Sequence, residues 1–205
     1  MKKTLSTIAI SLLALTTLAT TAAYTTYKYI PKTGTVATDS ESEVMAAFRY
    51  LNQVRQNPAA YSQEIGVDLS DVQPRPELKW NDILAQVATQ RAQDMVNRNY
   101  FAHVDPDGYG TNIKLQNAGY TLNPKFYAKP SDNFFESLAA GHADGKSSVI
   151  QLINDGGGTH EQSGHRLHLL GIKEFWANCD EIGIGRAEGG RYGTVWCFII
   201  AKHDF

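Results

Sequence analysis

The sequence predicts an α+β fold in which helices pack against a small antiparallel sheet. Apolar residues repeat at helical spacing in the first half of the chain. Near the C-terminus, two β-rich runs, residues 181–187 and 194–201, flank the glycine-containing segment 188–193, which is typical of a hairpin. The 205 residues, less an N-terminal segment, are enough for one domain with its own hydrophobic core.

Two long helices are predicted before the hairpin. The first opens at residues 40–43, whose Ser-Glu-Ser-Glu sequence has capping-box spacing, and its apolar stripe ends at Asn57-Pro58. The second runs from an N-cap at Asn81 to about Arg98 and leads the chain toward His103.

Three shorter elements are expected between the second long helix and the hairpin. Residues 112–117 and 147–154 are predicted to be short helices, because Gly119 and the glycines at 156–158 stop the helical pattern. Residues 132–138 are expected to form a further strand.

The N-terminus has the pattern of an export signal. Lys2 and Lys3 precede an uncharged stretch, 4–27, and small residues at 19–23 offer a cleavage site. The same stretch is long enough to span a membrane, so an uncleaved anchor is the alternative to a cleaved signal peptide. The protein is therefore expected to be secreted or otherwise extracytoplasmic, with membrane contact only through this anchor. The chain divides into a signal peptide or signal anchor (1–30), a linker (31–42) and one domain (43–205).

Composition bears on nucleic-acid binding and on whether the protein contains a disulfide. The net charge of −2 and the lack of a basic cluster in the domain argue against nucleic-acid binding. The two cysteines, Cys179 and Cys197, fit an oxidising compartment and are expected to form a disulfide across the hairpin. The alternative is two buried free thiols.

Three residues far apart in sequence are candidates for one polar cleft: His103, Glu136 and His165. Two neutral imidazoles and a carboxylate suit zinc or another divalent cation, and three protein ligands leave a position open to water. In that arrangement Glu136 is also the candidate general base. The alternative is a hydrogen-bonded structural network without an ion.

The order and spacing of several phrases resemble a known family. The phrases are Leu51-Asn52 with Arg55, Phe101-Ala102-His103, Phe135-Glu136-Ser137-Leu138-Ala139-Ala140-Gly141, Gly164-His165-Arg166-Leu167-His168 and Glu181-Ile182-Gly183-Ile184-Gly185. Over residues 43–203 they resemble the bacterial branch of the CAP superfamily, also called the SCP domain, which unites cysteine-rich secretory proteins, insect antigens and plant pathogenesis-related proteins. The resemblance implies an α-β-α sandwich with a small antiparallel sheet. It also implies a central cleft that receives two histidines and one or two glutamates, here His103, His165 and Glu136.

Two departures from the family pattern concern this cleft. Phe135-Glu136-Ser137 stands where family members usually have Gly-Glu-Asn. Many relatives carry a second cleft glutamate on the helix before the second histidine, and the corresponding segment 149–154 has none. Asp155 or Glu161 is the expected substitute.

Three classes of function are compatible with these observations, and the sequence does not decide whether the protein is an enzyme. The favoured one is an exported binding module whose cleft holds a divalent cation and a small amphipathic or peptide-like ligand; lipid or an extracytoplasmic protein is an alternative partner. The second is a metal-dependent extracellular hydrolase, protease-like or nuclease-like, with Glu136 as general base. The third is a structural or adhesive envelope protein with a vestigial cleft.

Overall fold

The computed structural model describes residues 39–204. The expected signal segment and most of the expected linker lie outside these residues. Helix α1 (Asp39–Gln56) begins inside the expected linker, so residues 40–43 form its first turns instead of capping it. Residues 39–42 contain no glycine or proline that would stop a helix. The helix ends before Asn57-Pro58, as predicted.

Four strands form one sheet in the order β1-β3-β4-β2. They are β1 (Lys79–Trp80), β2 (Glu136–Ala140), β3 (Glu181–Glu188) and β4 (Thr194–Ala201). Strand β4 is antiparallel to both of its neighbours, whereas β1 is parallel to β3, so the sheet is mixed and not purely antiparallel. The predicted hairpin is confirmed, because β3 and β4 pair over their whole length.

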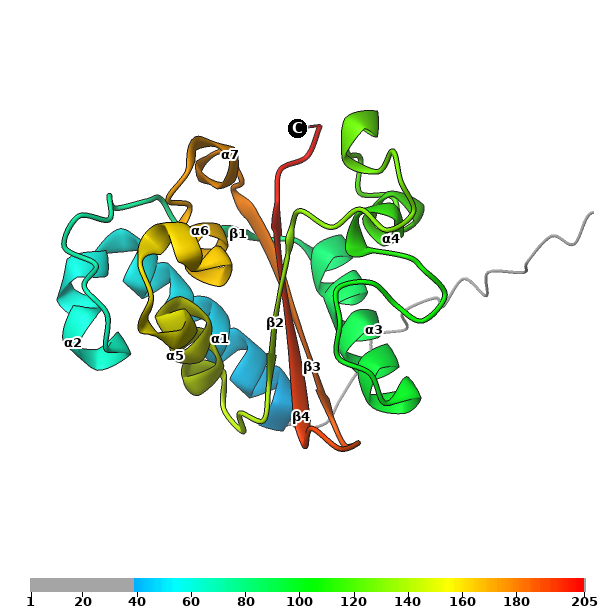
Figure 1. Cartoon of the computed structure of the whole chain (residues 1–205), viewed down its shortest axis with the longest axis horizontal. Helices are drawn as coiled ribbons and strands as arrows, with labels where there is room; N and C mark the ends of the chain where they lie inside the picture. Colours follow the sequence, from blue (N-terminus) through cyan, green and yellow to red (C-terminus); the bar gives the residue numbers. More distant parts are fainter. Residues whose placement is uncertain (1–38, 205) are drawn as a thin grey trace, which may run out of the picture. The chain divides into compact units, whose positions relative to one another are not determined.

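Helices cover the two faces of this sheet, as the α-β-α expectation requires. Figure 1 shows the sheet edge-on, with α3 (Asp82–Arg98) and α4 (Thr111–Asn117) on one side and α1, α5 (Gly145–Asn154) and α6 (Gly164–Leu170) on the other. Short helices α2 (Ser62–Ile65) and α7 (Glu174–Ala177) complete the second layer. Among residues 39–204, no helix combines the length and the apolar character that crossing a bilayer requires.

Helix α3 agrees with its prediction at both ends. The side chain of Asn81 caps it by accepting hydrogen bonds from the backbone N–H groups of Ile83 and Leu84. The helix lies directly on β3, because Gly183 and Gly185 present no side chain: a Cβ atom at either glycine would lie within 2.2 Å of α3 backbone atoms. This contact fixes the helix that leads toward His103.

Strand β2 begins later than predicted. Residues 132–135 form a loop, in which the backbone N–H of Phe134 donates a hydrogen bond to the Asn112 side chain at 3.1 Å. That amide is therefore not available to β4. The predicted strand at 132–138 is observed at Glu136–Ala140.

The expected disulfide is wrong. Cys179 and Cys197 are both buried free thiols. The register places Cys197 opposite Gly185, while Cys179 lies two residues before β3 begins. Six residues of extended chain separate the two positions by about 20 Å, against the roughly 7 Å between Cα atoms that a disulfide tolerates.

Candidate functional site

A cavity of about 450 Å³ opens between β2, α6 and the loop that follows α3. His103, Glu136 and His165, the three residues singled out in the sequence, all line it. His103 and His165 are partly exposed, with 47% and 33% of their side chains accessible, whereas the Glu136 side chain is fully buried. The structure therefore brings together three residues that are up to 62 positions apart in the chain.

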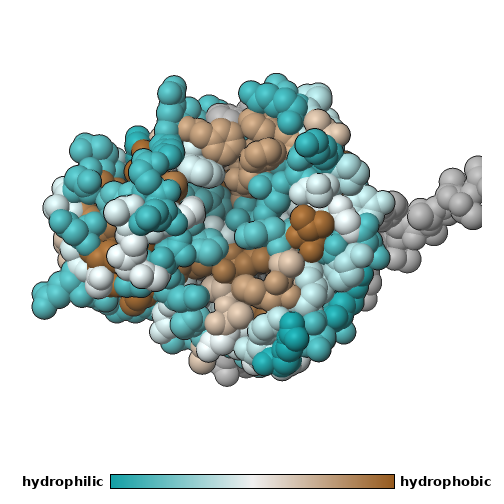
Figure 2. All heavy atoms as spheres, viewed as in Figure 1, coloured by the Kyte–Doolittle hydropathy of each residue, from teal (hydrophilic) through white to brown (hydrophobic). Residues whose placement is uncertain are grey.

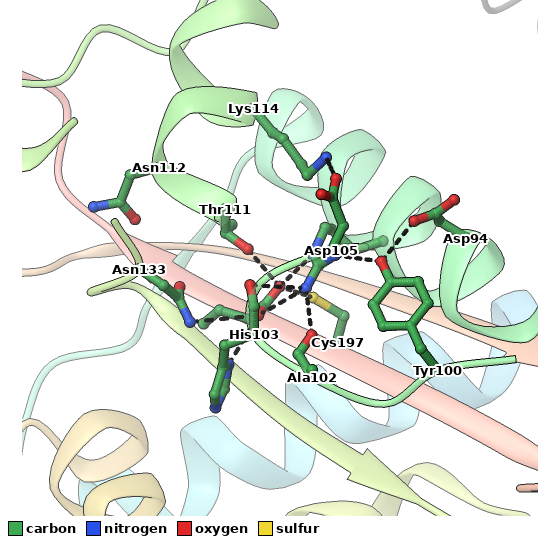
Figure 3. Close-up of polar contacts among 12 residues, drawn as sticks. Asp94, Tyr100, Ala102, His103, Asp105, Thr111, Asn112, Lys114, Asn133 and Cys197 are labelled. Atoms are coloured by element: carbon green, nitrogen blue, oxygen red, sulfur yellow. Dashed lines mark hydrogen bonds and ion pairs between the residues drawn. The ribbon is translucent and has the colours of Figure 1, made fainter. Parts of the chain in front are cut away.

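Glu136 is surrounded by hydrogen-bond donors, of which Asn133 is the most distant at 3.5 Å. Its Oε2 accepts hydrogen bonds from Arg91 Nε at 2.9 Å and Thr111 Oγ1 at 2.5 Å, and Cys197 Sγ lies 3.4 Å away. Its Oε1 lies 2.9 Å from Nδ1 of His103. Figure 3 shows Thr111, Cys197 and His103 converging on this point from α4, β4 and the loop after α3. Burial alone would raise the pKa of Glu136, but the hydrogen bonds from His103, Arg91 and Thr111 together lower it.

Arg91 connects this carboxylate to the segment that carries His103. Its Nη2 donates to the backbone carbonyls of Ala102 at 2.8 Å and His103 at 3.1 Å, and its Nη1 donates to the Tyr100 hydroxyl at 2.7 Å. Arg91 lies on the buried stripe of α3, between Ala88 and Met95. A charged residue within an apolar stripe indicates a buried ion pair. Arg91 could have been predicted as a site residue on this ground, but it was not.

The turn after His103 is built by Asp105. Its Oδ1 accepts hydrogen bonds from the backbone N–H groups of Asp107 at 3.0 Å and Tyr109 at 2.9 Å. Gly108 completes the turn with a positive φ of 89°. The chain therefore reverses its direction directly after His103, and this turn fixes the backbone from which the His103 imidazole projects.

His165 is held by Asp155 in the same way that His103 is held by Glu136. Nδ1 of His165 lies 2.9 Å from Asp155 Oδ1, and the backbone N–H of His165 donates to Oδ2 at 3.2 Å. Asp155 ends α5 in the left-handed region, with φ 45°. Of the two expected substitutes for the missing glutamate, Asp155 is the one in the cleft, because Glu161 pairs with Lys173.

The cleft thus contains two matched histidine–carboxylate pairs. A carboxylate only accepts hydrogen bonds, so Nδ1 carries the proton in each neutral ring and Nε2 keeps its lone pair. Within residues 39–204, Nε2 of His103 and Nε2 of His165 make no hydrogen bond to the protein. These two nitrogens are the atoms through which the cleft can bind a ligand.

Ser137 and His168 form part of the buried floor of the cleft and bind each other. They are almost completely buried, Ser137 Oγ lies 2.7 Å from Nδ1 of His168, and Nε2 of His168 lies 3.3 Å from the Ile200 carbonyl oxygen. Burial lowers the pKa of His168 to about 4, so its ring is neutral. Ser137 therefore binds His168 at the position where the family usually has asparagine.

The positions of the two histidines and of Glu136 decide which of them could bind a divalent cation. In the described part of the chain, no three His, Cys, Asp or Glu side chains are grouped closely enough to hold an ion as they stand. Glu136 has both oxygens occupied by protein donors, so it lies behind His103 and not beside it as a further ligand. The two histidines fit, because a metal-binding imidazole ordinarily donates its other ring N–H to a carboxylate.

A second hollow, of about 600 Å³, lies over the loops at residues 66–71 and 157–160. Its polar side chains already satisfy one another: His160 lies 2.9 Å from Asp71, and Arg166 donates to the backbone carbonyls of Ile153, Asn154 and Gly158. This hollow therefore presents fewer free ligand atoms than the cleft that contains His103 and His165.

Comparison with known protein families gives a match to the model of the CAP family, described as the cysteine-rich secretory protein family, over residues 48–200. The chain belongs to the CAP family. No protein of curated function matches it by sequence. The predicted family membership is therefore confirmed by a match that spans well over half of the chain.

Three solved structures are similar to this chain, and the first shares its fold. An outer surface protein from Borrelia burgdorferi aligns with a TM-score of 0.52 and 15% identity, covering 82% of this chain and 97% of that one. An extracellular protein containing an SCP domain from Bacillus anthracis aligns at 0.46 and 20% identity, covering 82% and 45%. Venom allergen-like protein 4 from Schistosoma mansoni aligns at 0.46 and 15% identity, covering 82% and 92%. The α+β prediction is confirmed.

Proposed function

We propose that this CAP domain is an exported binding module whose cleft holds one divalent cation, zinc or a similar ion, through Nε2 of His103 and Nε2 of His165. The observation that supports it is the pair of carboxylates, Glu136 and Asp155, each 2.9 Å from the Nδ1 of one histidine in the same cavity. Such a partner fixes the tautomer and increases the basicity of the ligating nitrogen.

The cation would give the cleft an attachment point for a ligand. Zinc is a Lewis acid that binds oxygen or nitrogen atoms of small molecules. The chain's own residues orient the two imidazoles and close the base of the cavity with buried side chains. The proposal is a binding function, because the cleft offers positioned imidazole nitrogens, while both of its carboxylates are engaged by protein donors.

The geometry disfavours the hydrolase reading. A general base must be within reach of a water molecule and have a pKa near the working pH. The Glu136 side chain has no exposed surface, its oxygens are occupied, and its pKa is lowered. Asp155, the other carboxylate, is engaged by both the ring and the backbone of His165.

Export is part of the same proposal. The N-terminal signal pattern supports it, together with the fold shared with an outer surface protein of Borrelia burgdorferi. Mass determination of the protein recovered from the producing cells tests it. A mature chain that begins near residue 24, or an intact chain in the membrane fraction, is expected, whereas intact protein in the cytosol contradicts export.

A thermal-shift titration with ZnCl₂ tests the cation site. The free energy of unfolding should increase by about 2.7 kcal/mol when zinc is at one hundred times its dissociation constant, because the ion binds only the folded cleft. His103→Ala and His165→Ala should each abolish the shift. His160→Ala is the matched control, since His160 pairs with Asp71 outside the cavity and should leave the shift unchanged.

Two results contradict the proposal. If zinc does not change the melting temperature of the wild-type domain, the cleft is a structural network without an ion. If His103→Ala retains the full zinc shift, the ion binds elsewhere.

A further inference from the structure

Among the described strands, β2 lies at one edge of the sheet and pairs with β4 alone. Two backbone hydrogen bonds bracket this pair: Ile200 N–H donates to Phe135 O at 3.0 Å, and Gly141 N–H donates to Thr194 O at 2.9 Å. In an antiparallel pair, hydrogen-bonded residues alternate along the strand. Odd-numbered residues from 135 to 141 therefore face β4, while Glu136, Leu138 and Ala140 direct their backbone N–H and C=O groups away from it.

Within residues 39–204, these outward groups have no hydrogen-bond partner. In the described part of the chain, no hydrogen bond joins the backbone of Glu136, Leu138 or Ala140 to any loop or side chain. The residue Glu136 is 7% exposed although its side chain is 0% exposed, so its accessible surface is main chain. Residues 137–140 also contain no proline or charged side chain of the kind that blocks a sheet edge.

The two ends of this edge are the accessible parts: Glu136 lines the cleft and Ala140 is partly exposed, while Leu138 between them is 5% exposed. Figure 1 draws β2 in front of the other strands, with no element before it. Figure 2, from the same direction, shows apolar atoms in a hollow at the place where Figure 1 draws β2. Exposed aromatic side chains flank both ends of the strand: Phe134, 45% exposed, precedes it, and at the other end Phe101, 36% exposed, packs on Tyr192, whose carbonyl oxygen is near Gly141.

We propose that this edge binds an extended polypeptide segment, which adds to the sheet as a further strand beside β2. The inference rests on the proposed function in that one end of the bound segment, beside Glu136, enters the cleft that contains the two histidines. It specifies the ligand as a peptide, whose backbone matches the three outward residues.

Hydrogen-bond complementarity selects this occupant. The outward residues recur every second position, about 7 Å apart, and each offers one donor and one acceptor, which is the spacing of an extended backbone. An acyl chain would cover the apolar wall but would leave these donors and acceptors buried without partners, at roughly 1–3 kcal/mol each. The aromatic side chains at the two ends then contact alternate side chains of the peptide.

Backbone methylation of a bound peptide tests this directly on the wild-type protein. Twelve-residue peptides are selected from a displayed random library on the purified domain, and the strongest is resynthesised with N-methyl groups on alternate amides in either frame. One frame places the methyl groups against β2 and should weaken binding at least about tenfold, because several hydrogen bonds of about 1 kcal/mol each are lost. The other frame should bind as the parent peptide does.

Hydrogen exchange locates the contact. On peptide binding, the amides of Glu136, Leu138 and Ala140 should gain protection, while those of Ser137 and Ala139, already bonded to β4, should not change. Ala140→Pro removes one outward donor at an edge position that accommodates proline and should weaken binding. Ala140→Val keeps the donor and is the matched control.

Four outcomes overturn the proposal: no peptide enriched above background, equal loss in both methylation frames, no change in the amides of residues 136, 138 and 140, or protection of those amides by self-association without peptide. Displacement of the peptide by phosphatidylcholine vesicles would assign the hollow to lipid and overturn the proposal as well.

The measurements are made both in EDTA and with ZnCl₂. Peptide binding that persists in EDTA separates this inference from the cation proposal, and failure of either leaves the other testable.

Discussion

Arg91 is the residue on which the geometry of the cleft depends most. Its guanidinium is almost completely buried, holds Glu136 from one side and binds the carbonyls of Ala102 and His103 from the other. Burial alone would lower the pKa of Arg91, but the hydrogen bond and charge of Glu136 raise it above its ordinary value. The ion pair therefore keeps both groups charged inside the domain.

Arg91→Met should reduce the free energy of unfolding by about 3–5 kcal/mol, because it leaves the Glu136 carboxylate buried without its partner. Chemical denaturation measures this loss. The double variant Arg91→Met/Glu136→Leu should regain much of it, since no unpaired charge remains. Equal or greater destabilisation of the double variant would show that packing, and not the ion pair, accounts for the effect.

His168 gives the domain a pH-dependent term of known sign. Its pKa is about 4 in the folded protein and near 6.5 when unfolded, so between these values the unfolded chain binds more protons. The contribution is fully present above pH 6.5 and is lost as the pH falls toward 4, by about 3 kcal/mol in total. Denaturation of wild type and His168→Gln from pH 7 to 4 measures it. A wild type and variant with identical pH dependence would contradict the assignment.

The sequence located the site residues better than it described their roles. His103, Glu136 and His165 carry recognisable local phrases, and the structure places all three in one cavity. Their hydrogen-bond partners depend on packing between distant segments, which no local pattern encodes. The sequence did not distinguish Asp155 from Glu161 as the substitute for the missing cleft glutamate. Glycines lie between these two residues, and a local pattern does not predict the path of the chain there, because Gly156 and Gly157 both have positive φ.

At the scale of elements, the strongest local signals gave the right boundaries. The Asn81 cap and the glycine-containing turn placed α3 and the β3–β4 hairpin correctly. Strand β2 was predicted to begin four residues too early, because Phe134 and Phe135 are residues that strands favour. In the structure, the hydrogen bond from the Phe134 N–H to the Asn112 side chain holds Phe134 in a loop. Cys179 and Cys197 were misjudged because both lie near the hairpin, and only the register shows how far apart they are.

The packing of α3 on β3 predicts a large effect from a small substitution. Gly185→Ala should destabilise the domain by about 3 kcal/mol or more, because the added Cβ would lie 2.2 Å from backbone atoms of Ala88 and Thr89. Gly164→Ala is the control, since a Cβ there meets nothing within 4 Å. Thermal denaturation should show a large loss for the first variant and little change for the second. A small effect of Gly185→Ala would mean that the two layers are not in close contact.

In the whole molecule, the sandwich brings one histidine to the cleft from each side of β2, and β2 itself supplies Glu136. His103 comes from the segment after α3, and His165 comes from α6 in the opposite layer. The sequence predicted these layers through the family resemblance and the helix and strand patterns. The facing of the two histidines across the cleft is a consequence of layer packing, and therefore appears only in the folded molecule.

The cation site is tested most directly by the metal content of the purified domain after equilibration with ZnCl₂ and removal of free ion, measured by inductively coupled plasma mass spectrometry. We expect one zinc ion per chain for wild type and His160→Ala, and none for the His103→Ala/His165→Ala double variant. A wild type without zinc, or a double variant that retains one ion per chain, would contradict it.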